Sequence, residues 1–304
     1  MSNYKILLGL IFIAVLIFGC GSSSGSSSNG ADVSSSDISL SLLGELPAEV
    51  SESSGLIKAD GKLYTHNDSG DSPWLYEIDP VSGSVLRTII VNGADNVDWE
   101  DVASDDTHIY IGDFGNNLGD RSDLKIYKIL ISDLILNVVN AEIISFSYAD
   151  QSIYGYAPFT TPYDAEALVS YNGTLYLFTK SWDDYISKIY KFPNQAGTYS
   201  VSPVGERHFD ILVTGASIDK VNNSIALVGY SNPYDTTTPF KSQVIVLNDF
   251  IGDDLFSGSV KVHEILNSFE GGQIESIVYE TPSKFYISSE GNPTAKFFEV
   301  SHAF

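Results

Sequence analysis

Cysteine, methionine and basic residues are all scarce in this chain of 304 residues. The single cysteine, Cys20, excludes an intramolecular disulfide, so stability must come from packing, strand closure or a metal. Only 16 Lys and Arg stand against 39 Asp and Glu, which gives a net charge of −23. This balance argues against nucleic acid as a partner and favours cations, although the same charge would also serve solubility. The histidines share no spacing, so the sequence does not indicate a histidine-based metal site.

Helical periodicity is also missing. Apolar residues alternate or come in runs of about four to six, and short turns rich in Gly, Asn, Asp and Pro separate them. Typical runs are Gly61–Tyr64, His108–Ile111, Gly173–Phe178 and Lys284–Ile287. Each follows a short polar turn, so the pattern predicts an all-β chain built from hairpins.

The long apolar run of the chain lies near its start, from Ile6 to Phe18, and leads to Gly19-Cys20. Residues 1–19 are therefore predicted to be a lipoprotein signal peptide with lipidation at Cys20. A membrane-spanning anchor is the alternative, but about 13 apolar residues are short for one. Residues 20–36 form a Gly/Ser tether. We expect a lipid-anchored protein of the cell envelope, at the outer membrane because Gly21 follows Cys20.

The remaining residues, 37–304, contain five copies of one pattern, which predicts a five-bladed β-propeller. In each copy a polar residue is followed ten positions later by an aromatic or aliphatic residue; the leading residues are Ser54, Glu100, Glu166, Ser217 and Glu275. Fourth strands are expected at Ser84–Val91, Ala141–Tyr148, Tyr199–Val204 and Val260–Leu266. We expect the alternating segment Ile38–Leu42 to pair with the last blade and close the ring. A six-bladed ring is the alternative if residues 130–162 hold a further unit.

The five leading residues should meet at the axis, because the first strand of each propeller blade lines the central channel. Three of the five are Glu, and carboxylates that lie this close must take up protons or hold a cation. Ca²⁺ fits best, since it accepts six to eight oxygen ligands in irregular geometry. The alternative is a set of polar residues around water in the channel.

Loops after the second strands should gather at one mouth of this channel. They carry His66, Asp68, Lys180 and Glu290, together with Asp113, Asn116, Asn117 and Arg121. Acids, amides and cations above a metal are typical of a polar-ligand or phosphoester site. The segment Asn67–Gly70 would equally suit an ordinary turn, and His66 is either a general base or a hydrogen-bonding bystander.

Gly61-Lys62-Leu63-Tyr64 followed by Asn67-Asp68-Ser69-Gly70, with the order of the five leading residues, resembles the calcium-activated nucleotidases, or apyrases. The resemblance implies a five-bladed propeller with a central Ca²⁺ bound by those five residues. It also implies that Asp68 and Lys180 fall on that family's acidic and basic positions. Asp98–Asp101 and Gly112–Asn117 with Arg121 resemble exported bacterial propellers of the SdiA-regulated and phytase-like kinds.

Two functions follow from these patterns. The first is a calcium-binding, membrane-anchored propeller that binds a polar small molecule or a protein at the channel mouth. The alternative is a calcium-dependent hydrolase of nucleotides or other phosphoesters, with Asp68, His66, Lys180 and Glu290 around the metal. Because Ser69 stands where the nucleotidases carry Arg, binding is the first expectation.

Overall fold

The computed structural model describes residues 38–302 except 236, 267–271 and 292–293. The expected signal peptide, Cys20 and the tether lie outside the described residues. The described part is all-β, with short 3-10 helices η1 (Ala48–Val50), η2 (Ile131–Ile135) and η3 (Leu255–Ser257). None of its helices has the length and apolar character needed to cross a membrane.

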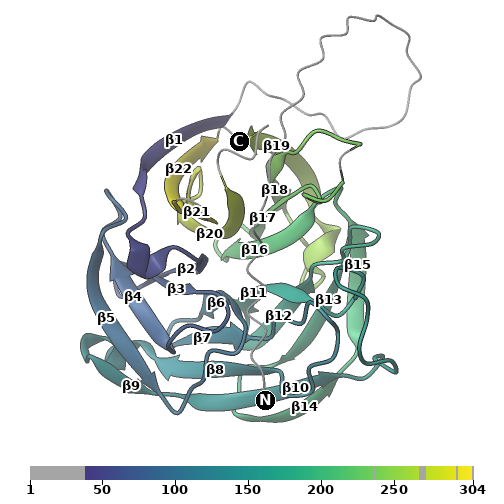
Figure 1. Cartoon of the computed structure of the whole chain (residues 1–304), viewed down its shortest axis with the longest axis horizontal. Helices are drawn as coiled ribbons and strands as arrows, with labels where there is room; N and C mark the ends of the chain where they lie inside the picture. The colour runs from purple at the N-terminus through teal and green to yellow at the C-terminus, as the bar shows by residue number, and fades with distance from the viewer. Residues whose placement is uncertain (1–37, 236, 267–271, 292–293, 303–304) are drawn as a thin grey trace, which may run out of the picture. The chain divides into compact units, whose positions relative to one another are not determined.

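The strands form five sheets, blades 1 to 5, set around a common axis with their first strands innermost (Figure 1). Blade 1 contains β2 (Ser53–Ala59), β3 (Lys62–Asn67), β4 (Trp74–Ile78), β5 (Val85–Asn92) and β9 (Val138–Asn140). Blade 2 contains β6 (Trp99–Ser104), β7 (His108–Asp113), β8 (Lys125–Leu130), β10 (Glu142–Tyr148) and β14 (Gly197–Val201). Blade 3 contains β11 (Ala165–Tyr171), β12 (Thr174–Thr179), β13 (Ile186–Pro193) and β15 (Pro203–His208). Blade 4 contains β16 (Leu212–Asp219), β17 (Ser224–Tyr230), β18 (Ser242–Asn248) and β19 (Ser259–Leu266). Blade 5 contains β20 (Gln273–Thr281), β21 (Lys284–Glu290), β22 (Lys296–His302) and β1 (Ile38–Glu45).

The first described strand closes the ring, as the sequence predicted. β1 pairs antiparallel with β22, with Ile38 opposite His302 and Leu40 opposite Val300. The chain therefore completes its last blade with a strand from the other end of the fold (Figure 1). This pairing covers the outer edge of β22, an edge that would otherwise be free to pair with another chain.

Two short strands cross from one blade to the outer edge of the preceding one. β9 pairs in parallel with β5 of blade 1, and β14 pairs in parallel with β10 of blade 2. The segment 130–162 thus supplies η2, β9 and the whole of β10 rather than a sixth blade. The strand expected at Tyr199–Val204 needs correction: the chain there divides into β14, in blade 2, and β15, in blade 3.

The hydrophobic core lies between the blades rather than in one central layer. Five clusters of buried side chains each join two neighbouring blades; Tyr64 and Ile111, for example, share the cluster between blades 1 and 2. Strands in the middle of a blade are therefore covered on both faces. This explains why β17 is buried along its whole length and why the apolar runs are continuous rather than alternating.

A buried carboxylate joins three inner strands near the axis. Asp101 of β6 accepts hydrogen bonds from the backbone N–H groups of Val102 (2.8 Å), Leu168 of β11 (2.8 Å) and Ala216 of β16 (3.3 Å). Burial raises the pKa of Asp101 well above its usual range, and the backbone donors oppose that shift. Asp101 therefore links blades 2, 3 and 4 by hydrogen bonds where their first strands converge.

Ring closure by β1 gives the first prediction. A chain that starts at Leu46 lacks β1 and leaves β22 as an open edge, so we expect its melting temperature to fall by about 5–10 °C and its tendency to self-associate to rise. Differential scanning fluorimetry and light scattering measure both effects. The matched control is a chain that starts at Ile38, and equal behaviour of the two chains would contradict the role of β1.

Candidate metal centre at one mouth of the channel

The leading residues predicted from the repeats lie at breaks in strand register. Ser54, Glu166 and Glu275 each stand as the extra residue of a β-bulge between the first and second strands of a blade. Glu100 and Asp101 together occupy the corresponding break in blade 2. A bulge leaves its residue out of the strand ladder and redirects the side chain. The bulges therefore set the four residues at one level of their inner strands.

The register in blade 4 differs from the prediction. There the bulge residue is Thr214, whose hydroxyl donates to the carbonyl of Ile274 (2.6 Å), and Ser217 lies three residues further along β16. The turn between β16 and β17, residues 220–223, is two residues longer than the turn at residues 60–61 in blade 1. The ten-residue spacing therefore pointed to Ser217. In the pairing of the first two strands, however, Ser217 of blade 4 occupies the position that Ile57 has in blade 1, and Thr214 occupies the position of Ser54.

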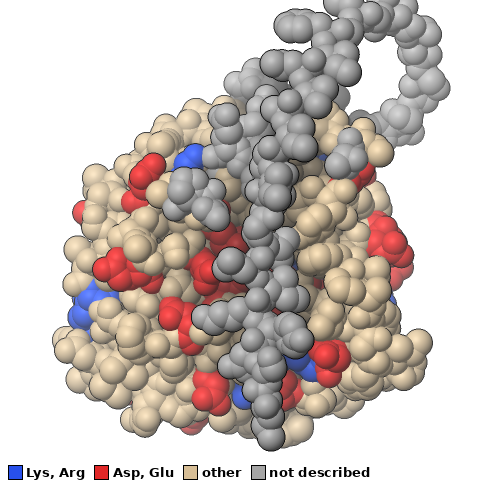
Figure 2. All heavy atoms as spheres, in the orientation of Figure 1, with Lys and Arg blue, Asp and Glu red and all other residues tan. Residues whose placement is uncertain are grey.

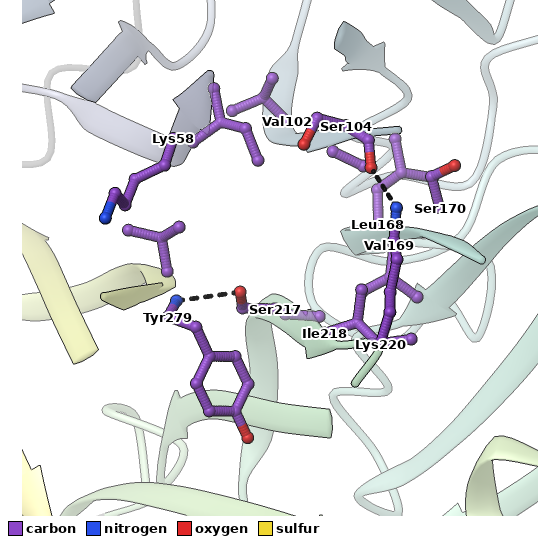
Figure 3. Close-up of a pocket in the computed structure, with 14 residues that line it drawn as sticks. Lys58, Val102, Ser104, Leu168, Val169, Ser170, Ser217, Ile218, Lys220 and Tyr279 are labelled. Carbon is purple, nitrogen blue, oxygen red and sulfur yellow. Dashed lines mark hydrogen bonds between the residues drawn. The ribbon is translucent and has the colours of Figure 1, made fainter. Parts of the chain in front are cut away.

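Ser217 instead lines a cavity formed by the distal ends of the five inner strands (Figure 3). Its hydroxyl accepts a hydrogen bond from the backbone N–H of Tyr279 (3.1 Å), and Lys220 donates to the carbonyl of Ser104 (3.2 Å). The cavity measures about 140 Å³, which is small for an organic ligand. Ser217 is thus in contact with a different set of residues from the other four.

Five carboxylates converge at the bulge end of the inner strands. Ligand atoms of Asp68, Asp98 and Glu100 all lie within 4.8 Å of one another, and so do those of Glu100, Asp164 and Glu166. Asp68 directly follows β3, whereas Asp98 and Asp164 directly precede β6 and β11. The grouping therefore brings together blades 1, 2 and 3 and includes three of the acids named from the sequence.

Asp98 and Asp164 were not identified from the sequence. Each lies two residues before a leading Glu, in Asp98-Trp99-Glu100 and Asp164-Ala165-Glu166. Because residues two apart on a strand share a face, a repeated Asp-x-Glu at a strand start places two carboxylates on the same side. This repeat was the available signal for both residues.

Two further acids and one lysine complete the group. Lys180 pairs with Glu166 (Nζ to Oε1, 3.0 Å), and the Tyr230 hydroxyl donates to Oε1 of Glu275 (3.0 Å). The side-chain amide of Gln273 lies 3.3 Å from both Glu275 Oε1 and Glu290 Oε2. We call the seven carboxylates the acidic centre: Asp68, Asp98, Glu100, Asp164, Glu166, Glu275 and Glu290. Among the described residues, Lys180 is the only base in an ion pair with any of them.

A loop after β7 is fixed directly against the acidic centre. Arg121 donates to Gly115 O (2.9 Å) and to Asp113 Oδ1 (2.9 Å), and the backbone N–H of Asn116 donates to Asp164 Oδ1 (2.8 Å). A Cβ at Gly115 would lie 2.0 Å from Glu100 Oε1, so a larger residue there would displace this carboxylate. Arg121 therefore acts on the centre by holding the loop, not by pairing with its acids.

The acidic centre resists ionisation. Burial and the neighbouring carboxylates raise the pKa of Asp98 to about 7 and the pKa values of Asp164, Glu275 and Glu290 to about 8. The same causes raise the pKa values of Asp68 and Glu100 well above their usual range. Burial alone would lower the pKa of Lys180, but the Glu166 carboxylate raises it well above normal. Acids also outnumber bases on the face in Figure 2. The centre therefore needs protons or added cations.

His66 lies outside these carboxylate groupings. Its ring is fully buried and packs edge-on against Trp99, with centroids 5.5 Å apart, and its Nδ1 lies 3.1 Å from the carbonyl of Asn67. Burial lowers the pKa of His66 to about 4, so the imidazole is neutral at pH 7. Its contacts are those of a core residue between blades 1 and 2.

Comparison with known proteins gives structural similarity at very low sequence identity. No protein-family model matches the chain, and no curated protein sequence matches it significantly. The PQQ-bound aldose sugar dehydrogenase from Streptomyces coelicolor is 10% identical, with a TM-score of 0.48 over 90% of this chain and 100% of that chain. The apo form of the soluble aldose sugar dehydrogenase from Escherichia coli is 10% identical, with a TM-score of 0.46 over 88% and 100%. A DUF4221-family member from Bacteroides vulgatus is 11% identical, with a TM-score of 0.42 over 89% and 100%. At these values the likenesses carry no argument about activity.

Proposed function

We propose that this protein binds Ca²⁺ at the acidic centre and uses the loaded centre to bind a polar ligand at the channel mouth. The observation that carries the proposal is the Glu100 carboxylate. The residue is only 4% exposed, its carboxylate belongs to groupings with four other acids, and no described residue donates a hydrogen bond to it. So many carboxylates in a place with little access to solvent are costly unless cations or protons compensate their charge.

The chemistry of the donor set favours calcium over other metals. The groupings offer carboxylate oxygens without histidine or cysteine, which suits a hard cation and not Zn²⁺. The acids come from three blades and from loops as well as strands, and Ca²⁺ accepts six to eight oxygens in irregular geometry, whereas Mg²⁺ demands a near-ideal octahedron. Asp68 and Asp98 are partly exposed, so an ion beside them keeps solvent-facing positions for a ligand.

A second candidate function is hydrolysis of nucleotides or other phosphoesters. The partial exposure of Asp68 and Asp98 favours it, because a metal with open positions can polarise a phosphoryl oxygen while a carboxylate activates water. Lys180 would stabilise negative charge on the transferred group. The neutral, buried His66 is poorly suited to act as the base, so Asp68 or Glu290 would fill that role.

The location of the protein follows from residues outside the described part. We propose that the chain is exported, lipidated at Cys20 and held in the cell envelope by residues 20–36, with the propeller exposed to ligands outside the cytoplasm. The absence of any second cysteine is consistent with this route, since the lone residue then has a defined role.

The calcium proposal predicts a change in stability. Because an ion that binds only the folded state stabilises it, EDTA should lower the melting temperature by about 5 °C and added Ca²⁺ should restore it. Glu166→Gln should blunt this response, whereas the exposed control Asp106→Asn, which removes the same charge, should retain it. Identical melting curves with EDTA and with Ca²⁺ would contradict the proposal.

The raised carboxyl pKa values predict how stability depends on pH. A carboxyl whose folded pKa is raised contributes stability at low pH, and that contribution is lost as pH rises through the folded value. Without metal, the melting temperature should therefore fall between about pH 4, where these carboxyls ionise in the unfolded chain, and about pH 8, where Asp98, Asp164, Glu275 and Glu290 have ionised in the folded protein. Ca²⁺ should reduce this fall, since it compensates the new charges. Scanning fluorimetry across this range, with EDTA or Ca²⁺, tests both statements.

The hydrolase alternative predicts calcium-dependent phosphate release from nucleoside di- and triphosphates. Asp68→Asn and Glu166→Gln should each reduce the rate by about tenfold or more, because one removes a candidate base and the other a metal ligand. Asp106→Asn should leave it unchanged. A wild-type rate no greater than that of Glu166→Gln would remove hydrolysis from consideration and leave binding.

A further inference from the structure

The acidic centre contains two carboxylate groupings, and they share one residue. Asp68, Asp98 and Glu100 form the first, and Glu100, Asp164 and Glu166 form the second. Within each grouping the ligand atoms lie within 4.8 Å of one another, but among the described residues the five acids do not form a single set within that limit. Oxygens bound to one Ca²⁺ lie about 2.3–2.6 Å from it and hence within about 5 Å of one another. Each grouping therefore has the dimensions of a separate ion site.

We propose that the centre holds two divalent cations, one in each grouping, bridged by the carboxylate of Glu100. This inference rests on the proposed function, since it requires that the acidic centre bind cations at all. It goes further by assigning the number of ions, the bridging residue and the class of ligand.

The contacts of Glu100 suit a bridging role. A bridging carboxylate must offer each of its oxygens to an ion, and Glu100 has no hydrogen bond from the described residues to occupy either one. The glycine at position 115 keeps the space beside it open. A Cβ there would lie 2.0 Å from Glu100 Oε1 and 2.5 Å from Asp98 Oδ2, so any side chain would enter the space between these two carboxylates.

An independent observation comes from Glu275, which belongs to neither grouping. Its Oε1 accepts from Tyr230 and Gln273, whereas its Oε2 is buried and has no hydrogen-bond partner, and the residue is only 4% exposed. Its charge interacts with Asp68 of the first grouping and Glu166 of the second. A buried oxygen without a partner, on a carboxylate whose charge interacts with both groupings, is a further ligand atom that a cation can use.

The balance of charge also favours two ions. One Ca²⁺ with Lys180 supplies three positive charges against the seven carboxylates of the centre, whereas two ions with Lys180 supply five.

The hydrogen bonds that hold Asp164 in place support the second site in particular. Its two oxygens accept from the Asn116 backbone (2.8 Å) and the Trp182 indole (3.0 Å), which fix its orientation and leave one further lone pair on each oxygen.

Two bridged cations define the class of ligand. Ions about 3.5–4 Å apart bind both oxygens of one oxyanion at the same time, and phosphate and phosphoester groups have that geometry. Asp68 and Asp98 of the first grouping are partly exposed, whereas the residues of the second grouping are buried, so a ligand would reach the pair from the side of the first grouping. The geometry thus points to a ligand that carries a phosphoryl group, whether the protein binds it or hydrolyses it.

The test is the calcium stoichiometry of the 37–304 body, which includes all described residues, by isothermal titration calorimetry. Wild type and the exposed control Asp106→Asn should each bind two Ca²⁺. Asp68→Asn should weaken one site and Asp164→Asn the other, each by about tenfold or more, whereas Glu100→Gln should weaken both. With Mn²⁺ as the probe, electron paramagnetic resonance should show a spin-coupled pair in wild type and isolated ions in Asp164→Asn.

Each outcome decides between defined alternatives. A single Ca²⁺ in wild type, sensitive to these substitutions, would overturn the two-ion inference and leave the proposed function intact. Two ions that none of the substitutions affects would place them elsewhere and overturn the inference. No calcium binding would overturn the proposed function as well. If Glu100→Gln does not fold, Asp68→Asn and Asp164→Asn still decide, because each leaves the other grouping complete.

Discussion

Apolar packing between neighbouring blades is the constraint on which the acidic mouth depends. Carboxylates that lie this close repel one another, and a flexible scaffold would relieve the repulsion by moving apart. Here the inner strands cannot separate, because five clusters of buried side chains hold each blade to both of its neighbours. The hydrogen bonds from Leu168 and Ala216 to Asp101 add a polar restraint near the axis. The fold thus concentrates negative charge where it could not gather on a loop.

The charge at this mouth is organised rather than diffuse. Lys180, Tyr230 and Gln273 satisfy part of Glu166 and Glu275, and Arg121 positions the loop that orients Asp164. The carboxylates of Asp98 and Glu100 accept no hydrogen bond from the described residues, and Oε2 of Glu275 is buried without a partner. This division separates the acids that the protein fixes from those available to an added cation.

Much of the fold could be predicted from the sequence, because short turns of two or three residues join the first two strands in blades 1, 2, 3 and 5. The site was predicted less completely. Ser217 was assigned to the wrong level of its strand because the turn after β16 is longer than the turns in the other blades. A longer turn changes the distance in sequence between the first two strands, and the sequence alone does not distinguish this from a shift in strand register. The positions of the β-bulges cannot be read from a single sequence. The parallel pairing of β9 with β5 and of β14 with β10 also depends on contacts between residues far apart in the chain, which local strand propensity does not predict. Asp98 and Asp164 could have been found from their repeated position before a leading Glu.

The two crossing strands have a consequence for how the ring comes apart. Because β9 and β14 tie blades 1, 2 and 3 to one another at their outer edges, no single one of these blades can detach without breaking the sheet of another. Within the described part, blades 4 and 5 have no such crossing strand and are joined to their neighbours by side-chain packing and by single hydrogen bonds, such as that from Thr214 to the carbonyl of Ile274. Partial unfolding should therefore begin at blades 4 and 5, the side of the ring where the described part of the chain begins and ends. The side that carries all five clustered acids would then open last, as one cooperative unit.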